Sequence, residues 1–175
     1  MAESLRGKLL IAAPSLFDYF RRSVILVLEH SHEGAMGVVL NRRSETPVSE
    51  AVPALAALPG AEEAVYVGGP VAPGSVVALG EFDDPAEAGT RVTGSLGTLD
   101  PDRPSPSLQR LRVYAGYAGW SPGQLDEELE EGAWIVEAAD EDDPFTDGDI
   151  WSVALRRKGG AYSLLATMPG DPSAN

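Results

Sequence analysis

The chain has 175 residues, of which 43% are hydrophobic, with no cysteine and a formal net charge of −14. This length predicts a single domain over residues 1–175, and the lack of cysteine excludes disulfides, thiolate metal sites and cysteine nucleophiles. The negative charge disfavours nucleic acid as a partner. No apolar run approaches the roughly 20 residues of a membrane-spanning helix, and no export signal is evident, so we expect a soluble cytoplasmic protein without a membrane partner.

The first predicted elements are a strand at Leu9–Ala13 and a β-hairpin over residues 20–43. The hairpin joins two apolar runs, Val24–Leu28 and Ala35–Leu40, through a polar turn that ends at Gly34. Arginine pairs flank the hairpin at residues 21–22 and 42–43.

A turn centred between residues 32 and 33 pairs residue i with residue 65−i. This register places Arg22 opposite Arg43, Ser23 opposite Arg42, and Asn41 opposite Val24. Like charges that face each other are unfavourable unless something neutralises them, and arginine can donate two hydrogen bonds to one oxyanion.

These residues suggest an anion site at the base of the hairpin. Its predicted members are Arg22, Ser23, Asn41 and Arg42, completed by the backbone amides of Gly68 and Gly69. In the alternative interpretation, each arginine pairs with a carboxylate such as Asp18 or Glu45.

Further along the chain the pattern predicts a helix over Val48–Leu58, strands at Ala64–Val67 and Val76–Leu79, and a surface excursion over residues 81–110 with one strand at Arg91–Thr93. The remaining predicted elements are a strand at Leu111–Ala115, a helix that begins at the N-cap Ser121, a strand at Ala133–Ala138, a helix capped by Asp147 and ending at Lys158, and a strand at Tyr162–Thr167. Strands in hairpin-like groups with few helices between them favour an α+β fold.

The segment GYAGW, residues 116–120, places Tyr117 and Trp120 beside glycines. One interpretation is close packing of a strand end against the following helix. The other is a pocket wall for a ligand or a peptide.

Three catalytic or metal-binding patterns fail on inspection. GWSPG resembles a nucleophile elbow, but Pro122 lacks the N–H that the oxyanion hole requires. His30 and His32 have no evident third ligand, so a hairpin-end role is preferred to a metal site. The acidic run before residue 149 lacks the ligand spacing of an EF-hand loop. We expect no cofactor, no metal and no catalytic residue.

Several segments, in order and over nearly the whole chain, resemble the AlgH/YqgE family of bacterial proteins. They are GKLLIAAPSL, FRRSVILVLEH, GAMGVVLNR, VGGPV, GYAGWSPGQLDEEL, GAW, WSVALRR and LLATMPGDPSAN. The resemblance implies an α+β fold in which a coiled, mainly antiparallel sheet closes partly into a barrel with helices around it. It also implies a cytoplasmic protein of unsettled biochemistry, for which some members carry the label of transcriptional regulator. The chain departs from the family pattern at NRRSE, where proline usually follows NR.

Three functional hypotheses follow. The first is a non-enzymatic binding or regulatory protein whose partner is a small anionic ligand or another protein. The second is an enzyme or receptor that acts on a small anion at the arginine-rich end of the hairpin. The third is direct DNA binding, which the net charge of −14 disfavours. Oligomeric state is not fixed by the sequence.

Overall fold

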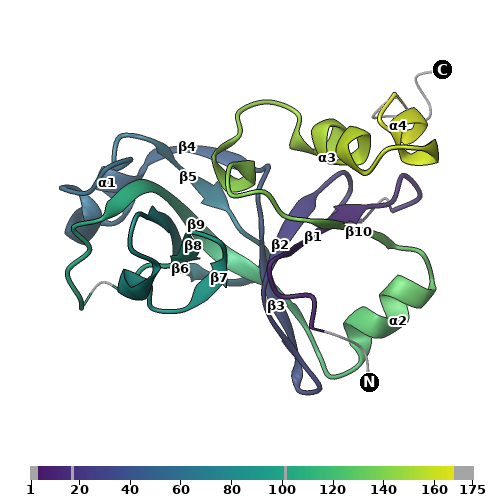
Figure 1. Cartoon of the computed structure of the whole chain (residues 1–175), viewed down its shortest axis with the longest axis horizontal. Coiled ribbons are helices and arrows are strands. Elements are labelled where there is room, and N and C mark those ends of the chain that lie inside the picture. The colour runs from purple at the N-terminus through teal and green to yellow at the C-terminus, as the bar shows by residue number, and fades with distance from the viewer. Residues whose placement is uncertain (1–3, 17, 101, 168–175) are drawn as a thin grey trace.

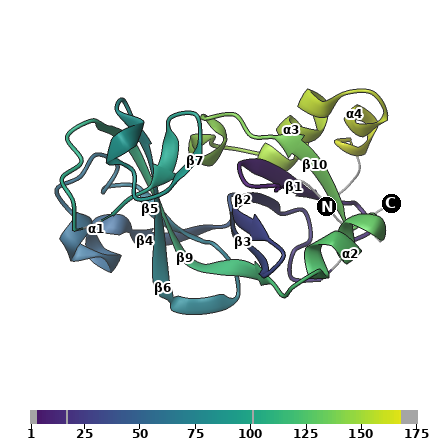
Figure 2. The ribbon, with the colours of Figure 1, turned by 60° about the horizontal axis from the view of Figure 1, so that its bottom comes forward.

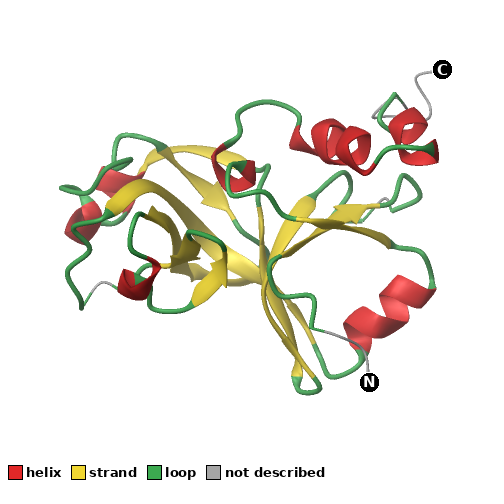
Figure 3. Ribbon diagram, viewed as in Figure 1, coloured by secondary structure: helices red, strands yellow, loops and turns green. Residues whose placement is uncertain are grey.

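The computed structural model describes residues 4–16, 18–100 and 102–167 (Figure 1). The strands are β1 (Lys8–Ala12), β2 (Val24–Ser31), β3 (Gly34–Val39), β4 (Arg43–Pro47), β5 (Ala64–Val67), β6 (Val71–Phe82), β7 (Arg91–Thr93), β8 (Leu96–Thr98), β9 (Leu108–Trp120) and β10 (Trp134–Ala138). The α-helices are α1 (Val48–Ala51), α2 (Gln124–Glu130), α3 (Ile150–Lys158) and α4 (Ala161–Leu165), and short 3₁₀ turns span Pro53–Leu55, Pro85–Glu87 and Asp143–Phe145. Figure 3 shows the helices at the periphery of the strands.

The strands form one mainly antiparallel sheet, which confirms the α+β prediction. Its main path runs in the order β10-β1-β2-β3-β9-β6-β8-β7, and β5, which pairs with β4, joins β9 in a parallel pairing. The two ends of this path do not pair, so the sheet is open and the predicted partial barrel closure is wrong.

The sheet stays open because it forks along β9. One edge of this long strand pairs first with β5, at Tyr66↔Tyr114, and then with β3, at Gly37↔Ala118. Gly68 lies at the fork, where its N–H donates to Ala115 O and its carbonyl accepts from Val39 N. The strands therefore diverge into two lobes instead of curling into a ring, and α1 lies at the opposite end of the molecule from α3 and α4 (Figures 1 and 2).

Helices cover both faces of the sheet around β2, which explains its unbroken apolar run. Val24, Leu26 and Leu28 pack in a cluster with Trp151 of α3. Ile25 and Val27 face the other side, in a cluster that includes Leu125 of α2. A strand buried on both faces has no polar positions to alternate with its apolar ones. A third cluster fills the other lobe, around β6, β9 and α1.

The predicted hairpin is confirmed, but its register changes part-way along. Near the turn, His30↔Ala35 follows the predicted rule, whereas Ile25↔Val39 is one residue out because a bulge intervenes between Val27 and Glu29. Leu40 N therefore donates to the carbonyl of Val24, and the predicted pairing of Asn41 with Val24 is wrong. The bulge adds a residue to one strand and shifts everything beyond it.

Local chemistry explains where the predicted helices differ. The helix predicted over Val48–Leu58 is interrupted at Pro53, which has no N–H for the ladder and begins a separate 3₁₀ turn. The α2 helix begins at Gln124 after Gly123, whose φ of 77° makes a left-handed turn, instead of being capped by Ser121. The first α3 residue is Ile150, and its N-cap is Asp149 instead of Asp147.

The strand predicted at Tyr162–Thr167 is instead the helix α4. Gly159 and Gly160 both have positive φ and reverse the chain, so that α4 returns against α3. The hydroxyl of Ser152 donates to Asp149 Oδ2 at 2.6 Å and lies 3.3 Å from Ala166 O, which places the end of α4 against α3. The tail after Thr167 lies outside the described residues. In the part of the chain that the structure describes, no helix is long and apolar enough to cross a membrane.

Candidate functional site

The two arginines predicted at the hairpin base contact aromatic rings. The Arg22 guanidinium lies 4.2 Å from the ring centroid of Trp151, and Arg22 has a left-handed backbone with φ of 54°. The Arg42 guanidinium lies 4.3 Å from the ring centroid of Tyr19 and donates to the carbonyl of the same residue. Both cations therefore have intramolecular contacts that compete with an external anion.

The two polar residues of the predicted anion site, Ser23 and Asn41, form hydrogen bonds with backbone atoms. Ser23 is buried, and its hydroxyl donates to Phe20 O at 2.6 Å. Asn41 accepts from Val24 N at 3.1 Å and donates to Arg22 O at 2.9 Å, so its amide replaces the missing strand ladder at this end of the hairpin.

Gly68 and Gly69 are buried against β9, and the Gly68 amide donates to Ala115 O. A Cβ atom on Gly68 would lie 2.4 Å from Gly116 O, and one on Gly69 would lie 2.2 Å from the carbonyl of Tyr117. These glycines are required for the close approach at the fork of the sheet. The anion site predicted at the hairpin base stays a prediction.

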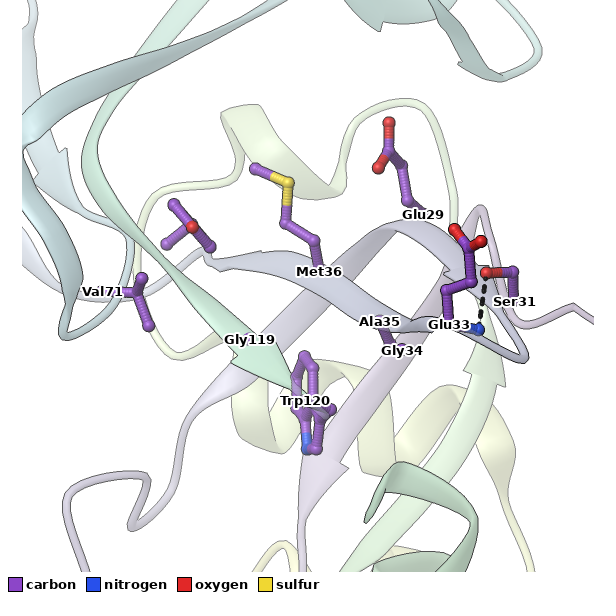
Figure 4. Close-up of a pocket in the computed structure, with 10 residues that line it drawn as sticks. Glu29, Ser31, Glu33, Gly34, Ala35, Met36, Val71, Gly119 and Trp120 are labelled. Atoms are coloured by element: carbon purple, nitrogen blue, oxygen red, sulfur yellow. Dashed lines mark hydrogen bonds between the residues drawn. The ribbon is translucent and has the colours of Figure 1, made fainter. Parts of the chain in front are cut away.

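The other two predicted residues, Tyr117 and Trp120, line a cavity of about 530 Å³ beside the hairpin tip. Figure 4 shows the cavity between the tip of the β2–β3 hairpin and the end of β9. Its lining residues are Glu29, Ser31, Glu33, Gly34, Ala35, Met36, Val71, Tyr117, Gly119 and Trp120. The volume lies in the range typical of small-molecule sites.

The charged groups in this lining are both carboxylates. Glu29 and Glu33 are exposed, and Ser31 Oγ accepts a hydrogen bond from Glu33 N at 3.1 Å, which fixes the turn that carries Glu33 (Figure 4). Met36, which pairs with Gly119 across the strands, and Val71 provide apolar surface. Carboxylates beside aromatic and apolar surface favour a cation with an apolar stem.

The two glycines of GYAGW have different roles. The close-packing interpretation of the segment describes Gly116, and the pocket-wall interpretation describes Gly119. A Cβ on Gly116 would lie 2.5 Å from Gly69 O, which is the close packing at the fork. A Cβ on Gly119 would make only ordinary contacts, at 3.6 Å from Tyr117 and 3.7 Å from Val71. Gly119 therefore leaves space that the cavity occupies.

Helix α2 fixes the indole of Trp120 through one carboxylate. Glu128 Oε1 accepts from Trp120 Nε1 at 3.0 Å and from Trp134 Nε1 at 2.8 Å. Its other oxygen accepts from Gln124 Nε2 at 2.9 Å, and Gln124 Oε1 accepts from Ser121 N at 3.0 Å. Both indoles are almost fully buried, so this chain of hydrogen bonds orders the end of β9 against α2 and β10.

His30 and His32 lie at the tip of the β2–β3 hairpin, the end at which the cavity lies. His30 Nδ1 accepts from Leu5 N at 2.9 Å, and its Nε2 lies 3.8 Å from a carboxylate oxygen of Asp126. His32 is exposed in the turn. Across the described parts of the chain, no three histidine or acidic side chains gather in a group that could hold a metal ion.

Comparison with known proteins identifies the family. A family model described as AlgH-like (DUF179) matches residues 9–163. The chain belongs to the AlgH-like family. The UPF0301 protein SCO2948 of Streptomyces coelicolor is 43% identical over 186 residues, which cover 98% of this chain and 96% of that protein. A UPF0301 protein of Mycobacteroides abscessus is 42% identical and is covered over 87% of its length, against 97% of this chain.

Two solved structures have the same fold. The crystal structure of protein DIP2367 from Corynebacterium diphtheriae matches with a TM-score of 0.84 and 34% identity, covering 95% of this chain and 94% of that one. The solution structure of AlgH from Pseudomonas aeruginosa matches with a TM-score of 0.71 and 29% identity, covering 98% and 100%. These matches confirm the family that the sequence motifs indicated, and this family is one of uncharacterised proteins.

Sequence reasoning missed most of the cavity lining. Glu29 and Ser31 alternate along β2, so their shared face could have been derived from the strand period. The i, i+4 spacing of Gln124 and Glu128 likewise placed them on one face of a helix. Val71 carries no such signal, because its place beside Tyr117 depends on the long-range pairing of β6 with β9.

Proposed function

We propose that this AlgH-like protein is a non-enzymatic binding protein whose hairpin-tip cavity receives a cationic side chain of a protein partner. The observation that carries the proposal is the lining of the cavity, in which Glu29 and Glu33 are the charged residues and Met36, Val71 and Tyr117 offer apolar or aromatic surface. A lysine or arginine side chain has the matching chemistry, because its apolar stem ends in a charged donor.

The surroundings favour a macromolecular partner over a buried metabolite. Val67, Val71 and Val76 are exposed beside the fork of the sheet, with 36%, 38% and 47% of their surfaces accessible. Val67 and Val76 pair with the same residue, Ala115, from opposite sides of β9, so they lie on one face. An apolar patch bordered by polar groups is the usual arrangement of a protein interface, and here the polar groups are acidic.

A regulatory role would then be exercised through a protein partner instead of through DNA. The net charge of −14 opposes approach to phosphate, whereas it steers a basic protein toward the cavity. The predicted anionic ligand at the hairpin base remains an alternative, and the contacts of Arg22 with Trp151 and of Arg42 with Tyr19 weigh against it.

The proposal is tested by titrating the protein with a blocked tetralysine peptide in a calorimeter at low salt. The Glu29→Gln/Glu33→Gln variant removes both cavity carboxylates, and Glu50→Gln/Glu62→Gln removes two exposed carboxylates elsewhere. We expect the first pair to weaken binding by roughly tenfold and the second by less than about twofold, since short-range charge pairs outweigh screened distant ones. Equal losses in the two variants would show attraction to net charge alone and would refute the site.

A second variant tests the cavity itself. Gly119→Leu places a side chain where Tyr117 and Val71 leave space, and the backbone at Gly119 is not left-handed. We expect this variant to fold and to lose peptide binding. Retained binding by a folded Gly119→Leu protein would place the contact outside the cavity.

A further inference from the structure

Arg112 is a buried arginine that forms no ion pair with any residue that the structure describes. It lies in β9, only 5% of its surface is accessible, and its buried Nε finds no hydrogen-bond partner within residues 4–16, 18–100 and 102–167. The guanidinium carbon is 4.4 Å from the ring centroid of Tyr66 and 6.0 Å from that of Phe145. Stacking on aromatic rings offsets only part of the cost of burying a charge, so an anion at this position would be strongly favoured.

The neighbouring arginine, Arg110, is in contrast paired with carboxylates. Arg110, two residues earlier on the same face of β9, lies 2.6 Å from a carboxylate oxygen of Glu81 and 2.6 Å from one of Asp142. Its hydrogen bond to Glu81 raises the pKa of Arg110. Among the described ion pairs, the arginines are Arg110 and Arg157, and Arg112 is not one of them.

Arg112 lines a small cavity of about 210 Å³, separate from the hairpin-tip cavity. The loop at Gly60 passes against Leu111 on one side, and the segment from Phe145 to Asp147 closes another. Its charged lining comprises the guanidinium groups of Arg110 and Arg112 and the carboxylates of Glu63 and Asp147. The two acids are exposed at the surface, and neither is within ion-pair distance of Arg112.

This arrangement selects for a ligand with both charges. A simple carboxylate would be attracted by Arg112 and repelled by Glu63 and Asp147, and a simple amine would meet the opposite pattern. A group with an anionic and a cationic end a few ångströms apart satisfies all three residues. The Gln109 amide and the Phe145 ring complete a wall with hydrogen-bonding and apolar parts.

We propose that this cavity binds a free α-amino acid, with its carboxylate on Arg112 and its ammonium group beside Glu63 and Asp147. Arginine offers two parallel donors to a carboxylate, and this geometry makes its planar group more selective than lysine. The termini of a peptide are too far apart to occupy both ends of so small a cavity, so the proposal is for the free molecule.

The first experiment screens the common L-amino acids individually at millimolar concentration by thermal shift and measures each hit by calorimetry. Each hit is compared with the same molecule lacking its amino group and with the same molecule lacking its carboxylate, such as propionate and ethylamine for alanine. We expect the intact amino acid to bind at least about tenfold more tightly than either fragment. The absence of any hit, or equal binding by the carboxylate alone, would overturn the proposal.

Variants then locate the binding. Arg112→Met should keep its fold, because it removes a charge without an ion-pair partner in the described structure, and should lose at least about tenfold in affinity. Arg103→Met, at an exposed arginine, is the matched control and should bind as wild type. If Arg112→Met does not fold, Arg112→Lys keeps the charge but not the paired donors and should also weaken binding. Unchanged affinity in a folded Arg112 variant would refute the assignment.

Removing the two acids tests the orientation of the ligand, because it should change which ligand the site prefers. In Glu63→Gln/Asp147→Asn the site keeps Arg112 but loses the acids that would hold the ammonium group. We expect affinity for the amino acid to fall and affinity for its deaminated carboxylate to rise. Parallel changes in both affinities would contradict the assigned orientation.

Discussion

Replacing Glu128 with alanine tests whether one carboxylate orders the end of β9. The substitution removes the acceptor shared by Trp120 Nε1 and Trp134 Nε1, whose residues are 7% and 5% accessible. A buried donor left without an acceptor costs about 1–3 kcal/mol, so two donors give about 2–6 kcal/mol. Because Glu128 is only partly buried and water can enter the vacated space, we expect about 2–4 kcal/mol in the free energy of unfolding.

The measurement is equilibrium unfolding in urea followed by far-ultraviolet circular dichroism, which does not depend on the two tryptophans. Glu128→Gln keeps one oxygen that can accept from both indoles, so it should lose less than half as much as Glu128→Ala. Glu130→Ala, on the exposed side of the same helix, should change stability by less than about 0.5 kcal/mol. A Glu128→Ala protein as stable as the Glu130 control would refute the idea that this carboxylate supports the two rings.

Two further predictions concern β9 and the strands beside it. Burial raises the pKa of the Tyr114 hydroxyl far above its ordinary value of 10.0. As the pH rises, the unfolded state therefore releases this proton before the folded state does. The free energy of unfolding of the wild type should fall by about 1.4 kcal/mol per pH unit above pH 10. Tyr114→Phe should remove this slope, which urea titrations at several pH values can measure. At neutral pH the same variant should be at least as stable as wild type, because the buried hydroxyl has no hydrogen-bond partner in the described part of the chain. Gly68→Ala would place a Cβ 2.4 Å from Gly116 O and should cost at least about 2 kcal/mol in thermal or chemical unfolding, whereas Gly74→Ala, with nothing within 4 Å, is the control and should be near neutral.

Local sequence signals predicted the elements whose structure depends on neighbouring residues. The apolar runs of the hairpin, the strand Ala64–Val67 and the polar turn at residues 31–34 were all readable from composition and turn chemistry. Helix boundaries were misplaced where local features such as Pro53 and Gly123 intervened, and the larger failures occurred where long-range packing decided the outcome. The helix α4 follows a chain reversal at Gly159 and packs against α3, and this tertiary contact has no local pattern in the sequence.

The open sheet could not be predicted for a similar reason. A closed sheet and an open one can contain the same strands in the same order along the chain, and they differ in whether the two ends of the sheet, here β10 and β7, pair with each other. The close contacts at Gly68 and Gly116 permit the fork, but a glycine in a sequence indicates only that some close approach exists. The partner of that approach is set by the tertiary fold.

The contacts of the arginines show why the candidate sites were hard to locate from the sequence. Sequence reasoning pairs each cation with an anion, and on that basis the arginines at the hairpin base required a ligand or carboxylates. In the structure Arg22 and Arg42 are placed over the faces of Trp151 and Tyr19, and these aromatic contacts leave no geometric sign of a ligand.

Arg112 is the opposite case. It lies in β9 two residues after Arg110, where an arginine on a strand suggests an exposed side chain, but the structure buries it beside a cavity, and no carboxylate of the described residues pairs with it. A buried guanidinium whose Nε has no acceptor is a stronger indication of a ligand than several cations close together in sequence, because its desolvation has already been incurred in the unliganded fold. Candidate sites should therefore be ranked by buried charged groups that lack a partner, and not by how many charged residues lie close together in the sequence. By this criterion the amino-acid site at Arg112 ranks ahead of the anion site at the hairpin base.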